Sequence, residues 1–578
     1  MSMTTHKDRA PLMEALTQYR LRGASSFHVP GHKNGRAYGL DPKYVDMLQS
    51  AMEIDVTEIT GTDDLFHPEG VIREAQELAA DCFGAEESYF LVGGSTSGNV
   101  ALILTVCEEP GDIILVQRNV HKSVLHGLML AGARAVFLQP GLDELSGLAV
   151  APSPETLRNA MAAYPGAKAA LITMPNYYGM GSDITPLADV CHEHGIPLLV
   201  DEAHGAHYGQ HPQLPASALS CGADGVVQST HKMLAAMTMG AMLHVQGERI
   251  NRHLLRQRLA MVQSSSPSYP IMASLDLARR LLHTQGAGAF TAGLAAVDAF
   301  RRGLAKLPRF GLLQPPQPGS PAAGTAAAGG QAPPQAGAAA YTRQDPFKAV
   351  IYDRTGALSG YALQRALEER GCVPEMSDEQ RVVLLFTLGS TLEDSNHVLW
   401  ALVHIVEQEE TSSKKPHIAG EAAKMRPAQS KEELIRMLKG RGDFMKHYEP
   451  GSRTDAALGP SDNLLLQEAG SESNVSTWNN WGMEAPYSNP IPFSLKHMDE
   501  GRIEPMPVEL CAGRMAAEMV IPYPPGIPIL YPGEVITEGM VQRLAELRDA
   551  GAKCQGIADP SLATIVVFRQ EGAALSVD

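Results

Sequence analysis

Between residues 88 and 245 the sequence alternates short apolar runs with helix-length segments, and this alternation constrains the fold most. The apolar runs lie at 88–92, 113–117, 134–138, 169–174, 197–200, 225–228 and 241–245. The segments 98–108, 120–131, 154–163 and 186–194 between them are long enough for helices. Repeated strand–helix units are typical of α/β domains with a mainly parallel sheet covered on both faces. We therefore predict a seven-stranded, mainly parallel sheet with functional loops at the carboxyl ends of its strands.

The remaining sequence divides into regions of different composition. Residues 315–337 consist mainly of Pro, Ala, Gly and Gln and carry no charge, which is typical of a linker. Polar residues dominate 408–490, with one helical pattern at 430–438. The predicted regions are an N-terminal helical arm at 1–30, a large domain at 31–310, a Pro/Ala/Gly-rich linker at 311–345, a small α/β domain at 346–408, a polar linker with a helical patch at 409–490 and a C-terminal α+β domain at 491–578.

Composition excludes several classes of partner. With 47 basic and 64 acidic residues the net charge is −17, which argues against binding to nucleic acid or to an anionic membrane. No apolar run reaches the length of a membrane span, and the first residues lack the apolar core of a secretory signal. Seven scattered cysteines without a C-x-x-C pair indicate neither a disulfide framework nor a zinc ribbon. We expect a cytoplasmic protein with no metal site.

A lysine follows one of the buried strands in a context that suits an aldehyde. The run 225–228 is apolar and bounded by turn residues, and Ser229, His231 and Lys232 come directly after it. The amine of Lys232 could condense with a carbonyl group while the hydroxyl and the imidazole bind a phosphate. Taken alone, the pattern is far more typical of an ordinary surface lysine. Three features upstream favour the chemical interpretation.

The first is a Gly/Ser/Thr-rich turn between a strand and a helix at 91–99. Free N–H groups at the helix start and the hydroxyl groups of Ser95, Thr96 and Ser97 would bind a phosphate. Such turns are common, so this one is a weak signal by itself. It is not a nucleotide-binding P-loop, because no Lys-Ser/Thr pair follows.

The second and third are an acid and a histidine at strand ends. Asp201 ends the strand 197–200, where a carboxylate can keep a pyridine nitrogen protonated. His121 follows the strand 113–117, where its ring could stack on a cofactor or simply cap a helix. The cluster His204, His207 and His211 also suggests a metal, but its spacing is not that of a zinc site. The phosphate-binding turn, the histidine ring, the strand-end acid and the lysine together indicate a pyridoxal phosphate site.

These residues resemble the Orn/Lys/Arg decarboxylase family, which has the aspartate-aminotransferase-like fold (fold type I of pyridoxal-phosphate enzymes). The resemblance extends to the motifs 27–33 (FHVPGHK), 60–64 (TGTDD) and 522–528 (PYPPGIP), and is dense over 25–300. It is closest to the short members of Gram-positive bacteria, several of which are arginine decarboxylases. Because the motif at 27–33 lies so near Met1, we expect the N-terminal wing domain of the larger acid-stress enzymes to be missing. The insertions at 315–337 and 440–490 depart from the family pattern.

The resemblance implies roles for individual residues. Lys232 would bind the cofactor covalently, Asp201 would pair with the pyridine nitrogen, and His121 and Ala203 would contact the ring. The catalytic set would be Lys232, His231, Asp201 and His121, and the cofactor-binding set would be Ser95, Thr96, Ser97, His121, Asp201, Ala203, His204, Ser229, His231 and Lys232.

The implied reaction is decarboxylation of a basic amino acid, most simply L-arginine to agmatine and CO2 in polyamine biosynthesis. Lysine and ornithine remain alternatives, as do an aminotransferase, a Cα–Cβ lyase and a non-catalytic regulator. A cationic substrate needs carboxylates, and the resemblance implies a homodimer or higher homo-oligomer in which active sites are shared between subunits. The candidates are Glu58, Asp63, Asp64, Glu69, Glu509, Glu518 and Glu534, and Arg514 is a candidate for binding a substrate carboxylate.

Overall fold

The computed structural model describes residues 6–39, 45–315, 341–413, 485–495, 500–523 and 526–569. Most of both predicted linkers, including the helical patch at 430–438, lies outside these residues. The chain forms two compact units, one of residues 1–403 with 477–578 and one of residues 404–476. Within the second unit the structure describes only the end of helix α13 (Leu392–Ser413). The fold and the site described below belong to the first unit.

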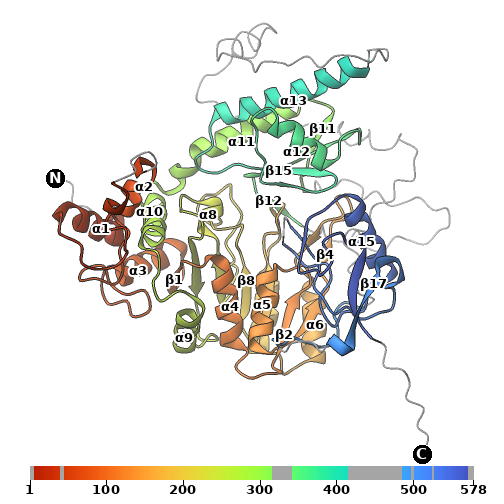
Figure 1. Cartoon of the computed structure of the whole chain (residues 1–578), viewed down its shortest axis with the longest axis horizontal. Coiled ribbons are helices and arrows are strands. Elements are labelled where there is room, and N and C mark those ends of the chain that lie inside the picture. Colours follow the sequence, from red (N-terminus) through yellow and green to blue (C-terminus); the bar gives the residue numbers. More distant parts are fainter. Residues whose placement is uncertain are drawn as a thin grey trace, which may run out of the picture. The chain divides into compact units, whose positions relative to one another are not determined.

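The predicted, mainly parallel sheet is present in the large domain (Figure 1). All seven predicted strands are confirmed. Its strand order is β1-β10-β9-β8-β6-β2-β3-β16. Neighbours from β9 to β3 pair in parallel, and β10 alone runs antiparallel to both of its neighbours. The seven strands are β1 (Glu87–Leu91), β2 (Ile113–Gln117), β3 (Arg134–Leu138), β6 (Ala170–Thr173), β8 (Leu198–Asp201), β9 (Gly225–Gln228) and β10 (Ala241–Val245).

An eighth strand, β16 (Ile491–Pro492), extends the sheet beyond the seven that were predicted. It pairs antiparallel with β3 and comes from the C-terminal part of the chain. Two residues are too few to show a strand periodicity, so this strand leaves no signal in the sequence. Phe493 continues from it into the core, where it packs against Phe137 and Tyr531.

Helices cover the sheet, and α4 (Gly94–Val106) is the most deeply buried of those near the site. Its residues are apolar on nearly all sides, as expected for a helix enclosed by the sheet and by other helices. Gly98 permits this close approach, since a Cβ there would lie 2.8 Å from Leu91 and 2.9 Å from Val227. The other helices of the large domain are α1 (Pro11–Arg22), α2 (Val45–Met52), α3 (Val71–Phe83), α5 (Lys122–Ala131), α6 (Pro154–Ala163), α7 (Thr185–Glu193), α8 (Thr230–Met233), α9 (Arg252–Val262), α10 (Tyr269–Gln285) and α11 (Thr291–Leu304), with 3₁₀ turns at His6–Asp8, Arg36–Tyr38 and Gly286–Phe290.

A second, antiparallel sheet carries the small α/β region. Its strand order is β11-β13-β15-β14, and α12 (Gly360–Glu368) packs against it. The antiparallel pair of β12 (Arg343–Gln344) with β7 (Met180–Gly181) joins this region to the large domain. The strands of the small sheet are β11 (Phe310–Leu312), β13 (Lys348–Asp353), β14 (Met376–Ser377) and β15 (Arg381–Leu385), and β4 (Gly141–Leu142) pairs with β5 (Ala149–Val150) in the large domain.

The C-terminal region has its own apolar core. Leu530, Ile536, Leu544, Ile565 and Val567 are all buried in it. Its elements are β17 (Ile503–Pro507), β18 (Ile521–Pro522), α15 (Glu538–Asp549), β19 (Cys554–Gln555) and β20 (Thr564–Phe568), with 3₁₀ turns at Glu500–Arg502 and Val508–Leu510.

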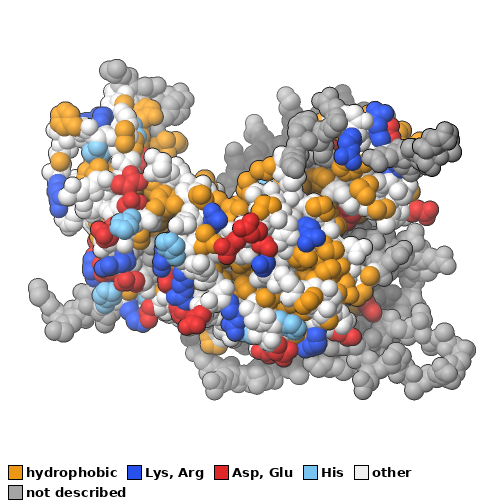
Figure 2. All heavy atoms as spheres, turned by 90° about the horizontal axis from the view of Figure 1, so that it is seen from below, with side chains coloured by type: hydrophobic (Ala, Val, Ile, Leu, Met, Phe, Trp, Pro, Cys, Tyr) orange, Lys and Arg blue, Asp and Glu red, His pale blue; other side chains and the backbone are white. Residues whose placement is uncertain are grey.

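Surface charge is mixed. On the face drawn in Figure 2 the acidic and basic side chains are interspersed with apolar ones. Among the described residues, every helix is too short or too polar to span a membrane.

Arg118 clamps the C-terminal region to the large domain. Its guanidinium, 1 % exposed, donates to both carboxylate oxygens of Glu534 at 2.9 Å. It also donates to the backbone oxygens of Pro528 and Ile529 at 3.0 Å each, and it stacks 4.3 Å from the ring centre of Tyr531. Burial raises the pKa of Glu534, and the neighbouring Arg118 opposes that rise. Arg118 and Glu534 are therefore buried and hydrogen-bonded to each other. Loss of either partner leaves the other buried charge uncompensated.

We predict that Arg118→Leu destabilises the protein by about 3–5 kcal/mol, because Glu534 would stay buried without its partner. Calorimetric unfolding should show a lowered Tm, with a smaller loss in the double variant Arg118→Leu/Glu534→Leu. Arg158→Leu, at an exposed position, is the control and should change stability by no more than about 0.5 kcal/mol. A double variant at least as unstable as the single variant would contradict this account.

Candidate functional site

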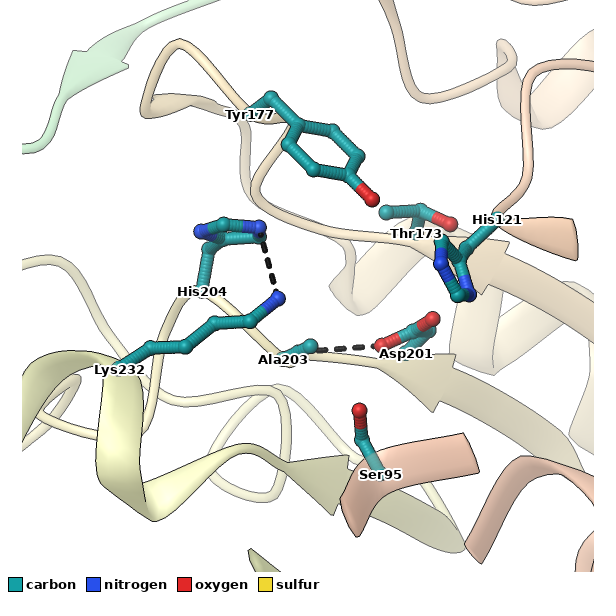
Figure 3. Close-up of a pocket in the computed structure, with 8 residues that line it drawn as sticks. All are labelled: Ser95, His121, Thr173, Tyr177, Asp201, Ala203, His204 and Lys232. Atoms are coloured by element: carbon teal, nitrogen blue, oxygen red, sulfur yellow. Dashed lines mark hydrogen bonds between the residues drawn. The ribbon is translucent and has the colours of Figure 1, made fainter. Parts of the chain in front are cut away.

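A pocket lies where the carboxyl ends of β6 and β8 meet the starts of α4 and α5 and the short helix α8 (Figure 3). Because β6 and β8 are parallel neighbours, Thr173 and Asp201 stand side by side at the same sheet edge. The lining residues come from segments spread over more than a hundred positions and are Ser95, His121, Thr173, Tyr177, Asp201, Ala203, His204 and Lys232. Six of them are predicted site residues; Thr173 and Tyr177 are not.

The amine of Lys232 points into this pocket (Figure 3). Its Nζ lies 3.0 Å from Nε2 of His204 and 5.7 Å from the ring centre of Tyr177. Burial lowers the pKa of Lys232, while the negative charges of Asp201 and Glu375 oppose that shift. A lysine with a lowered pKa is more often unprotonated and is therefore a better nucleophile toward a carbonyl group.

Asp201 is a buried carboxylate held in place by hydrogen bonds. It accepts from Nδ2 of Asn99 at 2.9 Å and from the backbone N–H of Ala203 at 3.1 Å. Burial raises the pKa of Asp201, and the cationic Lys232 works against this rise. A buried acid in a pocket with a nearby cation is suited to pairing with a protonated ring nitrogen.

His121 is oriented by a chain of hydrogen bonds that leads to Asp201. It caps the start of α5, and its Nδ1 accepts from the backbone N–H of Ser123 at 3.2 Å. Nδ2 of Asn99 donates both to Oγ of Ser123 and to Asp201, so one amide positions the acid and the imidazole. Burial and the nearby Lys232 lower the pKa of His121 to about 4, so its ring is neutral near pH 7.

Gly526, from the C-terminal region, lies beside this histidine. Gly526 has φ +89° and lies so close that a Cβ there would be 3.3 Å from the His121 ring. Its carbonyl oxygen accepts from the backbone N–H of Lys122 at 3.1 Å. The glycine is needed both for its backbone conformation and for the space it leaves beside the ring.

The predicted phosphate-binding turn lies at the start of α4. Oγ of Ser229 donates to Oγ of Ser95 at 2.8 Å, which joins the two segments. The N–H of Gly94 donates to the carbonyl oxygen of Met239 at 3.0 Å, and Gly93 before it has no side chain to cap the N–H groups that follow. Thr96 is exposed, whereas Oγ of Ser97 donates back to Gly94 at 2.8 Å.

His231 is turned toward its own loop. Its Nδ1 lies 3.1 Å from the carbonyl oxygen of Gly240, and burial lowers its pKa. This contact fixes the ring and leaves Nε2 for exchange of a proton with another group. Of the other histidines considered for a metal, His207 lies 3.0 Å from the carboxylate of Asp345, and both side chains are fully buried.

The structure places the predicted substrate acids outside the lining of this pocket. Asp63 accepts four backbone N–H groups between Asp64 and Ile72, which lower its pKa despite partial burial. Glu518 accepts from Ala558 at 2.7 Å and Val566 at 2.9 Å. The remaining candidates are distributed as follows: Glu58 is exposed, Asp64 accepts from Phe66, Glu69 pairs with His67, Glu509 pairs with Arg548, Glu534 pairs with Arg118, and Arg514 donates to Glu504 and Phe568.

Three groups near the pocket were not predicted. Thr173 ends β6, and Tyr177 follows four residues later, so the rule that sites form at strand ends would have found both. Lys348 lies 2.9 Å from Nδ1 of His204, although it belongs to the small sheet. Nothing in the local sequence around Lys348 signals that contact, because it depends on how the two sheets are joined.

Comparison with known proteins gives matches over nearly the whole chain. The family model of the Orn/Lys/Arg decarboxylase major domain matches residues 10–394, and that of the C-terminal domain matches residues 491–566. The uncharacterized protein YaaO of Bacillus subtilis (strain 168) is 36% identical over 548 residues, which cover 94% of this chain and 96% of YaaO.

Two further matches are to named enzymes. An arginine decarboxylase of Bacillus anthracis is 29% identical over 562 residues, covering 97% of each chain. The solved structure of the constitutive lysine decarboxylase of E. coli superposes with a TM-score of 0.70 at 22% identity, covering 97% of this chain and 82% of that one. The likeness to the latter establishes the fold.

Proposed function

Because this chain belongs to the Orn/Lys/Arg decarboxylase family and is a decarboxylase, we propose that it converts L-arginine to agmatine and CO2 with pyridoxal phosphate as its cofactor. The observation that carries the proposal is the convergence of Lys232, Asp201, His121 and Ser95 on one pocket. An amine, a buried acid, a neutral imidazole and a hydroxyl beside a helix start are the groups that this cofactor requires.

The residues present fit the cofactor. The uncapped start of α4, with Ser95 and Ser229, would hold its phosphate, and His121 and Ala203 would pack against its ring. Asp201 would pair with the ring nitrogen, and Lys232 would bind the aldehyde. Bound in this way, pyridoxal phosphate supplies an electron-accepting ring for the bond that breaks at the substrate's α-carbon.

The chain's own groups then control protons and water. Asp201, buried and fixed by Asn99, holds a proton at the ring nitrogen. The neutral His121 fills the space beside the ring and keeps solvent away from it. Nζ of Lys232 and Nε2 of His231 are the two nitrogens suited to returning a proton to the α-carbon after CO2 has left.

The choice of arginine rests on relatives. Four arginine decarboxylases of Bacillus and Halalkalibacterium are 29–30% identical over at least 90% of this chain, whereas the matching lysine decarboxylases are 24–27% identical. Lysine and ornithine remain the alternative substrates. An aminotransferase would instead form a keto acid, and a non-catalytic regulator would form no product.

We predict that the purified protein, supplied with pyridoxal phosphate, releases CO2 and agmatine from arginine faster than it releases diamines from lysine or ornithine. Lys232→Ala should abolish product formation, because no other lysine amine lines the pocket in the described part of the chain. Product would be measured by chromatography and CO2 by trapping. Lys168→Ala, at an exposed position, is the control. Diamine formation above agmatine formation would reject arginine, and keto acid would reject decarboxylation.

Glu375 is the acid that we propose for the substrate's cationic side chain. It is exposed, and its charge raises the pKa of Lys232, Lys348 and His231 against the effect of burial. The negative charge of Glu375 therefore acts on ionisable groups around the pocket, whereas the acids expected from the sequence lie outside the pocket lining. A guanidinium brought to this place would gain a charge-assisted hydrogen bond.

Glu375→Gln should raise KM for arginine by about 10- to 100-fold, which corresponds to loss of about 1.5–3 kcal/mol from a charged hydrogen bond. The effect on kcat should be smaller, because the side chain binds a part of the substrate that does not react. Steady-state kinetics would measure both constants. Glu248→Gln, also exposed, is the matched control and should leave KM unchanged. An unchanged KM in Glu375→Gln would exclude this role.

We propose further that the chain works as a homodimer or higher homo-oligomer with shared active sites. Large apolar side chains are exposed near the site, among them Met237 and Met239 (49% each), which lie in the loop that follows the helix carrying Lys232. Phe27 is 94% exposed and Val29 63%. Ordered apolar side chains with such exposure are typical of surfaces that a partner covers.

Light scattering should therefore give at least twice the mass of one chain. Phe27→Ser should shift the mass toward that of a single chain, because it removes apolar contact area from the proposed interface. Arg158→Ser, at an exposed polar position, is the control and should leave the mass unchanged. A single-chain mass for the unmodified protein would reject the proposal.

A further inference from the structure

A second lysine approaches the site from the opposite side of His204. Lys348 begins β13 of the small sheet and is 1% exposed. Its Nζ lies 2.9 Å from Nδ1 of His204, while Nζ of Lys232 lies 3.0 Å from Nε2 of the same ring. One imidazole thus bridges two lysine amines, both of them at hydrogen-bond distance.

Hydrogen-bond chemistry limits the protons that this trio can hold. A neutral imidazole has one N–H donor and one acceptor nitrogen, and an ammonium group only donates. Both contacts are satisfied when one lysine is an ammonium that donates to the ring and the other is a neutral amine that accepts from it. An imidazolium between two neutral amines satisfies them as well. In each arrangement the three groups share a single excess proton.

Burial favours this low charge. It lowers the pKa of Lys348 to about 8, and it lowers the pKa of His204 well below the usual value for histidine. The pKa of Lys232 is lowered for the same reason. Two ammonium groups separated only by a neutral ring in a buried site would repel each other strongly.

The surrounding charges do not remove the constraint. Asp345 and Glu375 act on Lys348, and Asp201 and Glu375 act on Lys232. Asp345 lies 3.0 Å from His207 and accepts from the backbone N–H of Phe347 at 2.9 Å. Asp201 accepts from Asn99 and Ala203, so these two carboxylates are engaged elsewhere. On the remaining sides His204 faces His121, His231 and the ring of Tyr177, the last at 4.5 Å between ring centres.

We propose that Lys348 is a positioning residue that sets the protonation of Lys232 through His204. To free the Lys232 amine, a proton passes from its Nζ to Nε2 of His204 while the Nδ1 proton passes to Nζ of Lys348. One N–H bond breaks and one forms at each side of the ring, so the total charge is unchanged. The reverse transfer returns the proton. The proposal deepens the function proposed above, because it concerns the amine that would bind the cofactor.

The test measures the reactivity of Lys232 in the full-length protein freed of cofactor. Cyanate carbamylates only neutral amines, so the rate of Lys232 modification against pH, followed by peptide mass spectrometry, reports its protonation. Lys348→Met should raise the pH of half-maximal rate by about one unit, because the shared proton then has no second site. Lys168→Met, at an exposed position, should leave it unmoved. No shift, or a downward shift, in Lys348→Met overturns the proposal.

A second variant, at His204, distinguishes proton transfer through the imidazole ring from simple charge repulsion between the two lysines. His204→Phe keeps a planar ring and removes both hydrogen bonds, so the shift caused by Lys348→Met should fall to less than half in this background. A shift that stays above half overturns the role of His204. Lys348→Gln replaces Lys348→Met if the latter does not fold.

The unmodified protein provides an independent reading. Two groups that share a proton titrate in two steps, so its rate–pH curve for Lys232 should be broader than that of a single group. A single-group curve overturns the proposal. Because carbamylation needs no turnover, this result and the product assay can fail separately.

Discussion

Parallel pairing of β6, β8 and β9 brings three strand ends to one edge of the sheet. The register places Thr173 opposite Asp201 and Asp201 opposite Val227, so the segment carrying Lys232 must leave the sheet beside the buried acid. The amine and the carboxylate are therefore neighbours although they are distant in sequence. The opposing effect that Asp201 and Lys232 have on each other's burial-shifted pKa follows from this register.

A buried polar network stiffens that edge. Asn99 on α4 donates to Asp201 and to Ser123, and Ser123 meets His121 at the start of α5. Three separate elements are thus linked by side chains that are almost fully buried, where hydrogen bonds are stronger and unpaired groups costlier than in water. The close approach of α4 to the sheet at Gly98 is what brings Asn99 within reach of the acid.

Much of this was readable from the sequence, and the exceptions have a common cause. The seven main strands and the residues Ser95, His121, Asp201, Ala203, His204 and Lys232 follow from local periodicity, from strand ends and from the family resemblance. Lys348, Glu375 and β16 could not be predicted from the sequence. Each of them acts on the large domain from another region of the chain, through contacts that leave no local sequence pattern. The acids suggested by loop position, such as Asp63, are occupied by backbone N–H groups that sequence alone does not reveal.

The contacts of Arg118 with Pro528, Ile529 and Glu534 bear on when, during synthesis of the chain, the site is completed. They fix the segment in which Gly526 lies against the ring of His121. A ribosome completes the seven main strands, the lysine and the acid long before it makes this segment or β16. The neighbourhood of His121 is therefore finished only in chains that are nearly complete, so a prematurely terminated product could contain all seven main strands and still have an unfinished site.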